Sequence, residues 1–388
     1  MQDLITYKDL YRKELMDNIL PFWERNSRDD IFGGYYTCLD RRGNVFDTDK
    51  FIWLQGRQLW FFSMIYNQIE PRQTWMGMAM LGADFLEKFG MDADGNWYFS
   101  LTREGQPLVQ PYNIFSDCFA CMGFAELYKA TGDTRHKEIA LRTYRNIQTR
   151  SENPKGLYNK LYPGTRPMKS FSLPMILCNL SLILEEVIGS DEVDKAVKPL
   201  IREVMEVFYQ KDSGLILENV SPDGSFVNCF EGRTVNPGHT NEAMWFMMDL
   251  AERYDDRELM KKATDILLRS IEYGWDTEHD GIFYFKDIKG YPPQQLEWDQ
   301  KLWWVHIETL IALLKGYKLT GDKSCLDWFL KIHDYTWENF RDTKFPEWYG
   351  YLTRQGAPLL TLKGGKWKGC FHVPRGLFQI WKTLEKME

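Results

Sequence analysis

His239 and His372 are each followed, three positions later, by a charged side chain. The first pair is His239 and Glu242 in NPGHTNEAMW, and the second is His372 and Arg375 in FHVPRG. Residues three apart share one face of a helix, so each imidazole and its neighbour would face the same site. A carboxylate fixes the tautomer of an imidazole and raises its basicity, whereas a cation holds the imidazole neutral or binds a substrate oxygen. Two histidines in one pocket suit the removal and return of a proton near neutral pH.

The other interpretations of these histidines are weaker. HxxE could supply two metal ligands, but the sequence has no HExxH, no third ligand nearby and no metal-type cysteine spacing, so we predict no metal. His306 lies two residues from Glu308, on a different helix face, and we expect it to pack in the core. Cys118 and Cys121 form a CxxC inside an apolar run, which favours packing over redox chemistry. We predict surface positions for the remaining histidines, His136, His279 and His333.

Further polar and aromatic side chains gather near the starts of apolar, helix-like segments. They are Arg57, Tyr112, Asn113, Trp303, Trp304 and Glu308. Buried polar groups need partners or a function, and single ones are often only caps. If the helices run parallel in a ring, however, all these starts face the same mouth. We therefore predict that they converge on one substrate pocket.

The elements that would position these residues recur along the chain. Six stretches combine aromatic residues with an Asp, Arg or Gly turn, as in GGYYTCLDRRGNVF, and alternating residues around such turns predict β-hairpins. Aligned on Tyr35, Trp97, Leu157, Leu215, Ile282 and Trp348, they are spaced by 62, 60, 58, 67 and 66 residues. Near-equal periods over the whole length indicate an internally repeated fold.

Two helical patterns lie between successive hairpins. One is apolar nearly all round, as in KLWWVHIETLIALLKGY, and the other is amphipathic, as in RELMKKATDILLRSIEYG. A helix that is apolar on every side is buried on every side, and a striped helix covers it. With YKDLYRKELMDNILPFW as the sixth striped helix, the pattern predicts an all-α fold. We expect an (α/α)6 barrel of six inner and six outer helices, with short β-hairpins in the connections and a single domain over residues 1–388.

Composition narrows the function. The formal charge is −7 and no basic run stands out, which argues against binding to nucleic acid or to an acidic membrane surface. The N-terminus lacks the apolar core of a signal peptide, no apolar run reaches membrane-spanning length, and the seven cysteines are scattered, so we expect a cytoplasmic protein. The 15 Trp, 20 Tyr and 24 Phe suit stacking on sugar rings. Together with two histidines, they indicate a carbohydrate with an acidic C–H beside a carbonyl.

These motifs resemble the N-acylglucosamine 2-epimerase family over essentially the full length. The resemblance rests on DTDKFIWLQGRQLWFFS, VQPYNIFSDCFA, NPKGLYNKLYPGTRPMK, NPGHTNEAMWF, QQLEWDQKLWWVHIE and GGKWKGCFHVPR. It implies an (α/α)6 barrel, generally homodimeric, that interconverts N-acetyl-D-glucosamine and N-acetyl-D-mannosamine. It also implies that ATP acts as an activator and is not consumed.

The resemblance also implies roles for individual residues. His239 and His372 would stand on either side of C2 of the ring-opened sugar, one removing a proton and the other returning it. Arg57 and Arg375 would stabilise the developing oxyanion. The remaining predicted roles are orientation by Glu242 and Glu308, and lining of the sugar site by Tyr112, Asn113, Trp304 and Trp367.

The segment LKGGKWKGCFHVPRG, which holds His372, also resembles a phosphate-binding loop. It lacks the G-x-x-x-x-G-K-[ST] frame and a preceding strand, so it is not a P-loop. Its glycines could form a mobile lid over the mouth. Alternatively, Lys366 and Lys368 could contact the phosphates of the activating nucleotide.

Several rival functions are open at this point. Cellobiose 2-epimerases carry a further histidine on the inner helix that matches LPMILCNLSLI, and its absence here favours an N-acylated monosaccharide. Aldose–ketose isomerases share the barrel and the paired histidines. A glycoside hydrolase would use Glu242 and Glu308 as its acid and base. A binding protein is a further possibility, since animal relatives associate with the protease renin, but a binder needs no paired bases.

Overall fold

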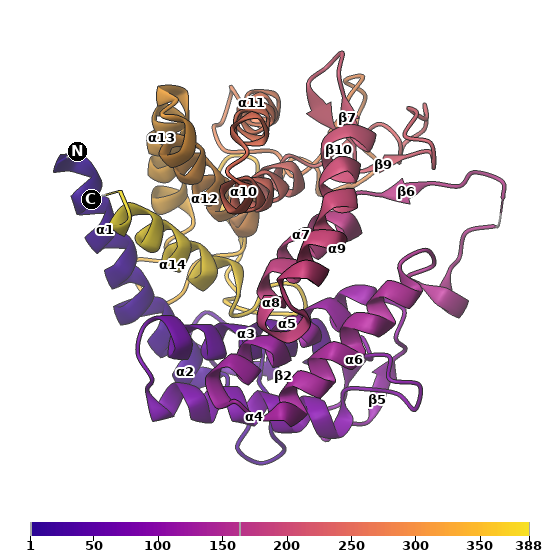
Figure 1. Cartoon of the computed structure of the whole chain (residues 1–388). Coiled ribbons are helices and arrows are strands. Elements are labelled where there is room, and N and C mark those ends of the chain that lie inside the picture. Colours follow the sequence, from indigo (N-terminus) through magenta and orange to yellow (C-terminus); the bar gives the residue numbers. More distant parts are fainter. Residues whose placement is uncertain (1, 163, 388) are drawn as a thin grey trace.

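The computed structural model describes residues 2–162 and 164–387, which form twelve long helices in an inner and an outer ring (Figure 1). The inner ring consists of α3 (Ile52–Gln68), α5 (Ile114–Thr131), α7 (Ser172–Ile183), α10 (Pro237–Tyr254), α12 (Trp303–Thr320) and α14 (His372–Glu385). The outer ring consists of α1 (Gln2–Lys13) with α2 (Leu20–Asn26), α4 (Gln73–Phe89), α6 (Thr134–Arg150), α9 (Ser190–Arg202), α11 (Arg257–Gly274) and α13 (Lys323–Asn339). The predicted (α/α)6 barrel is confirmed.

Shorter helical pieces complete the rings. A π-helical turn, Glu14–Ile19, joins α1 to α2, and a second one, Glu203–Val207, continues α9. The other two pieces are α8 (Glu185–Ile188) and a single 3₁₀ turn at Gly156–Tyr158.

Burial follows the apolar patterns that separate the two rings. Helix α12 is buried without interruption from Trp303 to Leu314, as its all-round apolar sequence requires. In α11 the buried positions recur every three or four residues, for example Leu259, Ala263 and Ile266, so only one stripe faces inward. Among the described residues, no helix is both long and apolar enough to cross a membrane.

The first and last helices close the ring. Helix α1 packs against α14, and both ends of the chain lie at the same side of the barrel in Figure 1. The hydroxyl of Tyr11 and Nδ1 of His333 form a hydrogen bond of 2.7 Å that ties α1 to α13. The N-terminal segment therefore serves as the sixth outer helix, as predicted.

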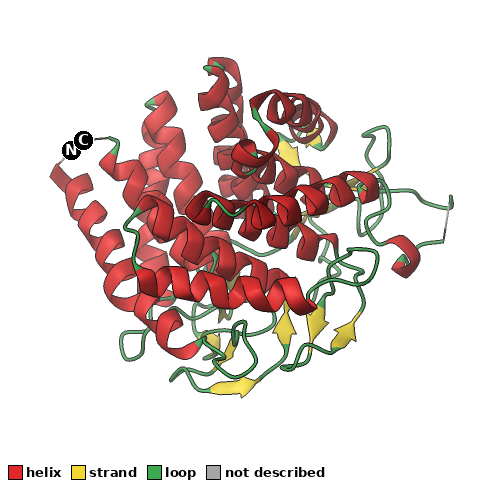
Figure 2. Cartoon of the chain, turned by 60° about the horizontal axis from the view of Figure 1, so that its bottom comes forward, coloured by secondary structure: helices red, strands yellow, loops and turns green. Residues whose placement is uncertain are grey.

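The strands are short and lie in the connections between helices (Figure 2). They are β1 (Cys38–Leu39), β2 (Val45–Asp47), β3 (Lys50–Phe51), β4 (Ser100–Leu101), β5 (Pro107–Val109), β6 (Lys169–Ser170), β7 (Tyr209–Gln210), β8 (Leu215–Ile216), β9 (Asn219–Val220), β10 (Thr234–Val235), β11 (Lys286–Asp287), β12 (Lys301–Leu302), β13 (Tyr351–Leu352) and β14 (Pro358–Leu360). All pairs are antiparallel. Strand β3 adds to β4, and β12 adds to β13, so the strand before an inner helix joins the next hairpin.

Three of the six predicted hairpins form within the described residues, as β1–β2, β4–β5 and β13–β14. In the fourth repeat β8 pairs with β7 just before it and β9 pairs with β6 of the preceding connection. In the fifth repeat β11 pairs with β10 of the preceding connection. The hairpin predicted in the third repeat, from Gly156, is wrong. Residues 156–162 form a 3₁₀ turn and an exposed loop instead, and Leu157 is 97% exposed. The other five aligned residues are buried and pair with the end of the preceding outer helix or the residues just after it. Leu157 has no such pairing among the described residues, so the third connection is not held against the core.

Three buried lysine–aspartate pairs repeat at equivalent places and hold the strand or segment that precedes an inner helix. Each lysine donates to an aspartate that follows an outer helix, and an arginine of another hairpin donates to the same carboxylate. The three sets are Lys50–Asp29–Arg103, Lys301–Asp276–Arg354 and Lys363–Asp342–Arg41. Burial alone would raise the pKa of these carboxyls, but the cations outweigh it and hold the pKa far below its ordinary range.

The surface assignment of two histidines is wrong. His136 is 1% exposed and His333 is 6% exposed, and burial lowers the pKa of His333 to about 4. Both lie on outer helices, which we expected to be exposed, but on the stripe that faces the inner ring. His279 lies in a connection and is partly exposed.

Candidate active site

The starts of the inner helices open into one cavity of about 540 Å³. Six of the predicted site residues lie on its wall: Arg57, His239, Glu242, Trp304, Trp367 and His372. The rest of the wall is formed by Trp53, Phe115, Phe119, Ser172, Met175, Ile176, Tyr284, Glu297, Gln300, Leu302, Trp303 and Tyr351. The cavity therefore draws on all six inner helices and on two of the connections between helices, those that precede α12 and α14.

His372 is the first residue of α14, and Glu308 of α12 fixes its ring. Nδ1 of His372 lies 2.7 Å from Oε1 of Glu308, which is fully buried. An ionised carboxylate only accepts hydrogen bonds, so Nδ1 carries the proton and Nε2 keeps its lone pair. Burial, reinforced by the positive charges of Arg57 and Arg375, holds the pKa of His372 well below its ordinary value. This imidazole is therefore neutral near pH 7.

His239 lies in the first turn of α10, which is capped by the Asn236 side chain. Its Nδ1 lies 2.9 and 3.0 Å from the two carboxylate oxygens of Glu218. Burial would lower the pKa of His239, but the adjacent Glu218 carboxylate outweighs this effect and raises it. Each imidazole thus has a carboxylate at Nδ1, but the pKa of His239 is raised while that of His372 is lowered.

Trp304 lies beside both histidines. Its ring centroid is 5.2 Å from that of His239 and 5.8 Å from that of His372. The close approach of α10 and α12 depends on Gly238, because a Cβ there would lie 2.7 Å from the indole of Trp304. Consecutive inner helices α10, α12 and α14 therefore place three rings on one side of the cavity.

Arg57 of α3 supplies a buried cation to the same cavity. Its guanidinium carbon lies 3.9 Å from the ring centre of Phe119 and 4.5 Å from those of Trp53 and Phe371. Burial lowers the pKa of Arg57 to about 9, which still leaves it cationic at neutral pH. No carboxylate within residues 2–162 and 164–387 forms an ion pair with it, and its Nε has no hydrogen-bond partner there. Arg57 is thus positioned to meet negative charge on a substrate.

Arg375 lies one turn below His372 and binds two carboxylates. Its Nη2 donates to Oε1 of Glu308 at 2.6 Å and to Oε1 of Glu242, while Trp245 donates to the other oxygen of Glu308 at 2.9 Å. The ligand atoms of Glu242, Glu308 and His372 lie within 4.8 Å of one another, a spacing suited to a metal ion. The guanidinium already provides the positive charge between the two carboxylates, so these residues do not need a metal to balance their charge. Neither Glu308 nor Arg375 lines the cavity, so both lie behind its wall, where they support His372.

Three other residues singled out from the sequence do not line the cavity but cap a helix or pack against other side chains. The side chain of Asn113 caps α5 by accepting a hydrogen bond from Phe115 N–H at 2.9 Å. Tyr112 packs 5.2 Å from Phe99 beside the rim, outside the cavity lining. His306 accepts a hydrogen bond from Ile282 N–H at 3.0 Å, and burial lowers its pKa to about 3, which confirms its packing role.

The lysine-rich segment from Lys363 to His372 is longer than the equivalent segments before α3 and α12. Helices α3 and α12 begin two residues after Lys50 and Lys301, whereas α14 begins nine residues after the equivalent Lys363. The longer segment carries Trp367, half exposed, to the cavity rim, 5.5 Å from Trp53. Lys368, 1% exposed, anchors this segment.

The ammonium of Lys368 donates to Glu347 and to the carbonyl of Lys363, both at 2.8 Å. It is thus not free to bind a phosphate, which contradicts its predicted role. Lys366 is exposed, with its ammonium over the rings of Phe99 and Trp367.

The residue that sequence reasoning missed is Glu218. It follows β8, and its backbone N–H donates to the carbonyl of Thr234 while its carbonyl accepts from Phe171 N–H, both at 2.9 Å. These bonds place it between the starts of α7 and α10. A lone acid in LILENV carries no local signal, because its partner His239 is 21 residues away. The apolar lining residues of α5 and α7 were also missed, since only polar helix starts were considered.

Comparison with known proteins identifies the family to which this chain belongs. Residues 34–373 match the profile of the N-acylglucosamine 2-epimerase (GlcNAc 2-epimerase) family. N-acylglucosamine 2-epimerase of Bos taurus is 40% identical over 398 residues, which cover 100% of this chain and 93% of the bovine protein.

Two solved structures share the fold. Cellobiose 2-epimerase of Spirochaeta thermophila superposes with a TM-score of 0.84 at 20% identity, covering 100% of this chain and 98% of that one. A D-mannose isomerase superposes with a TM-score of 0.83 at 17% identity, covering 97% and 98%. The solved structures show the fold, and the family profile together with the bovine relative shows that this chain belongs to the N-acylglucosamine 2-epimerase family.

Proposed function

We propose that this protein interconverts N-acetyl-D-glucosamine and N-acetyl-D-mannosamine by removing and returning the proton at C2 of the ring-opened sugar. The observation that carries the proposal is the pair of imidazoles, His239 and His372. Each has its Nδ1 held by a carboxylate, which leaves Nε2 as the nitrogen available in the cavity. The name and 40% identity of the bovine relative support the choice of substrate.

The charge preferences of the two histidines suggest how they divide the work. A C2 proton is acidic because the aldehyde at C1 accepts the electron pair that it leaves behind. His372, held neutral, takes this proton in one direction, and protonated His239 delivers one to the opposite face. In the reverse direction the roles exchange, as microscopic reversibility requires.

Arg57 stabilises the intermediate in this proposal. Removal of the C2 proton leaves an enediolate with negative charge on the C1 oxygen. A preorganised cation aimed at developing charge is worth of order 3 kcal/mol in a water-excluded site. Arg57 has no carboxylate partner among the described residues, so its charge is directed at the substrate.

Arg375 instead binds the carboxylate of Glu308 and holds it in place beneath His372. Its contribution is therefore to hold the carboxylate that orients this base.

The acidic residues favour this reaction over glycoside hydrolysis. A retaining hydrolase needs two carboxyl groups about 5–5.5 Å apart, and an inverting one needs them further apart, on opposite sides of the bond. Glu242 and Glu308 bind the same Nη2 atom of Arg375, and Glu308 is fully buried. An aldose–ketose isomerase would share the deprotonation step, so analysis of the product is the test between those two.

Other features of the proposal rest on the family resemblance. They are activation by ATP that is not consumed, a homodimer and a cytoplasmic location. Of the two lysines predicted to contact nucleotide phosphates, only Lys366 offers an exposed ammonium. If ATP activation is lost in Lys366→Ala, the nucleotide binds near the cavity rim; if it persists, the nucleotide binds elsewhere.

Incubation with N-acetylmannosamine in heavy water, with and without ATP, tests the proposed reaction. We expect deuterium at C2 together with N-acetylglucosamine signals in the NMR spectrum, and loss of both in His372→Ala. A wild-type protein that shows no C2 exchange in the presence of ATP would refute the proposal. Formation of a ketose would point to isomerisation instead.

A further inference from the structure

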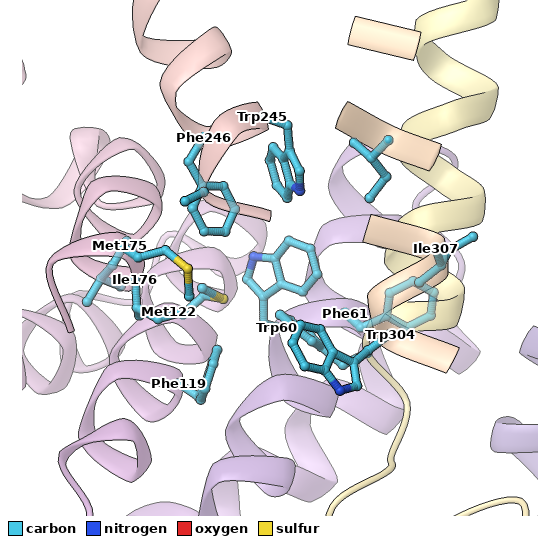
Figure 3. Packing of buried hydrophobic residues seen from close by; sticks show 14 of the residues in the cluster. Trp60, Phe61, Phe119, Met122, Met175, Ile176, Trp245, Phe246, Trp304 and Ile307 are labelled. Atoms are coloured by element: carbon cyan, nitrogen blue, oxygen red, sulfur yellow. The ribbon is translucent and has the colours of Figure 1, made fainter. Parts of the chain in front are cut away.

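Two parts of the cavity wall carry different kinds of side chain. Helices α10, α12 and α14 place His239, Trp304 and His372 on one side. Helices α5 and α7 provide the part opposite, which consists of Phe115, Phe119, Met175 and Ile176 with the hydroxyl of Ser172. Figure 3 shows Met175 and Ile176 across the barrel from Trp304. We call these four apolar residues the apolar wall.

A sugar ring alone does not match this surface. A hexose carries hydroxyl groups on almost every carbon, and a hydroxyl buried against apolar side chains loses hydrogen bonds to water without replacement. Met175 and Ile176 are 2% and 8% exposed. Because their side chains are a thioether and an alkyl group, they offer a ligand apolar contacts but no hydrogen-bond partner. The surface is complementary to an alkyl group.

The substrate of the proposed reaction carries one alkyl group, the end of its N-acyl substituent. The nitrogen is bonded to C2, the carbon that must lie within reach of both imidazoles. With O1 directed to Arg57 and the histidines on the α10–α14 side, the acyl chain extends toward α5 and α7. Ser172 is the first residue of α7 and supplies a hydroxyl for the amide beside the apolar wall.

We infer that the apolar wall is the subsite for the N-acyl group and that Met175 and Ile176 set the length of acyl chain accepted. This inference rests on the proposed epimerase function. A pocket that contacts an alkyl chain directly discriminates by about 10-fold or more for each methylene. Enlarging the wall should therefore change acyl preference without removing any group that moves a proton.

The first test compares N-acetyl-, N-propanoyl- and N-butanoylmannosamine as substrates. In Ile176→Ala and Met175→Ala, kcat/KM for the butanoyl sugar relative to the acetyl sugar should rise by about 10-fold or more. The control is Leu177→Ala, on the same helix but outside the cavity lining. Ile176→Val removes a single methylene and covers the case in which an alanine variant does not fold. Epimerisation with a ratio that is unchanged in every cavity variant would overturn the inference.

The second test does not depend on catalysis. With methionine methyls labelled with ¹³C and the Met175 signal assigned through Met175→Leu, N-acetylmannosamine should shift this signal and mannose should shift it less. If the Met175 signal responds while no C2 exchange occurs, the subsite stands and the proposed reaction fails. If C2 exchange occurs while the signal is equally insensitive to both sugars, the reaction stands and the subsite is refuted.

Discussion

Replacing Glu218 by glutamine removes the negative charge on the Nδ1 side of His239 and keeps an oxygen that can accept its hydrogen bond. The tautomer of His239 should therefore survive, while the electrostatic support for its protonated form is lost. Both side chains are largely shielded, at 27% exposure for His239 and 13% for Glu218. The charge matters here more than it would at an open surface.

The size of the effect follows from the contact. Two unit charges 4 Å apart interact by about 4 kcal/mol at an effective dielectric constant of about 20, and a hydrogen bond to a charged group contributes a net 1.5–3 kcal/mol, roughly. Allowing for partial solvent access, we take about 2 kcal/mol, which is roughly a 30-fold change in the protonation equilibrium of His239. Burial lowers the pKa of His239, and Glu218 is the main group that opposes it, with a smaller effect from Glu242, so the loss of the Glu218 charge lowers the pKa of His239 in the variant.

The direction of the His239 pKa shift sets the pH dependence of activity. In the wild type, the protonated form of His239 persists above the ordinary imidazole pKa of about 6.5 and is lost as the pH rises through the raised value. In Glu218→Gln we expect kcat/KM, in the direction where His239 is the acid, to fall by about 30-fold above neutral pH. The loss should shrink as the pH falls through the lowered pKa of the variant imidazole, where that ring is protonated again.

The assay is the pH profile of epimerisation followed by NMR, together with a ¹⁵N titration of the His239 ring. Glu231→Gln, which changes an exposed acid in the same connection, is the matched control. An activity loss that is equal at every pH, or a His239 ring that titrates as in the wild type, would refute the assignment of Glu218 as the positioning residue.

Three further predictions concern stability and activity separately. Arg57→Met should lower kcat by about 10²–10³ and leave the melting temperature unchanged or higher, because no carboxylate loses its ion-pair partner; a marked fall in melting temperature would contradict this. Gly238→Ala should destabilise the fold by roughly 1–3 kcal/mol in urea unfolding, since its Cβ would lie 2.7 Å from Trp304; wild-type stability would show that α10 and α12 are not so closely packed. Lys368→Met should cost about 3–5 kcal/mol by leaving a buried carboxylate unpaired, whereas Lys366→Ala, at an exposed position, should be neutral in the same measurement; equal effects would contradict the anchoring role of Lys368.

Repetition in the sequence was sufficient to predict the barrel. Tyr35, Trp97 and Ile282 recur at a near-constant period and are all fully buried, because each fills the same place in its repeat. All-round apolar and striped helices then sort into two rings without further information. The third repeat breaks this rule at Leu157, where an apolar residue at the right period has no neighbouring strand to hold it against the core.

The two histidines that we propose move the proton could also be found from the chain, since His239 and His372 stand at the starts of inner helices and all such starts meet at one mouth. Their environments could not be found in this way. His372 owes its low pKa to burial beside Arg57 and Arg375, and His239 owes its raised pKa to Glu218. These differences depend on side chains from other connections and helices, and the spacing of residues along the chain does not record them.

The sequence by itself determined the repeat, the ring of helices and the identity of the polar groups at its mouth, because these depend on local periodicity and chain order. Only the tertiary structure decided which charge meets which partner. It buried Lys368 against Glu347, brought Glu218 to His239 and set Met175 and Ile176 opposite the histidines. The physical reason is that pairing and desolvation act through distances of a few ångströms between segments far apart in the chain, and packing alone sets those distances.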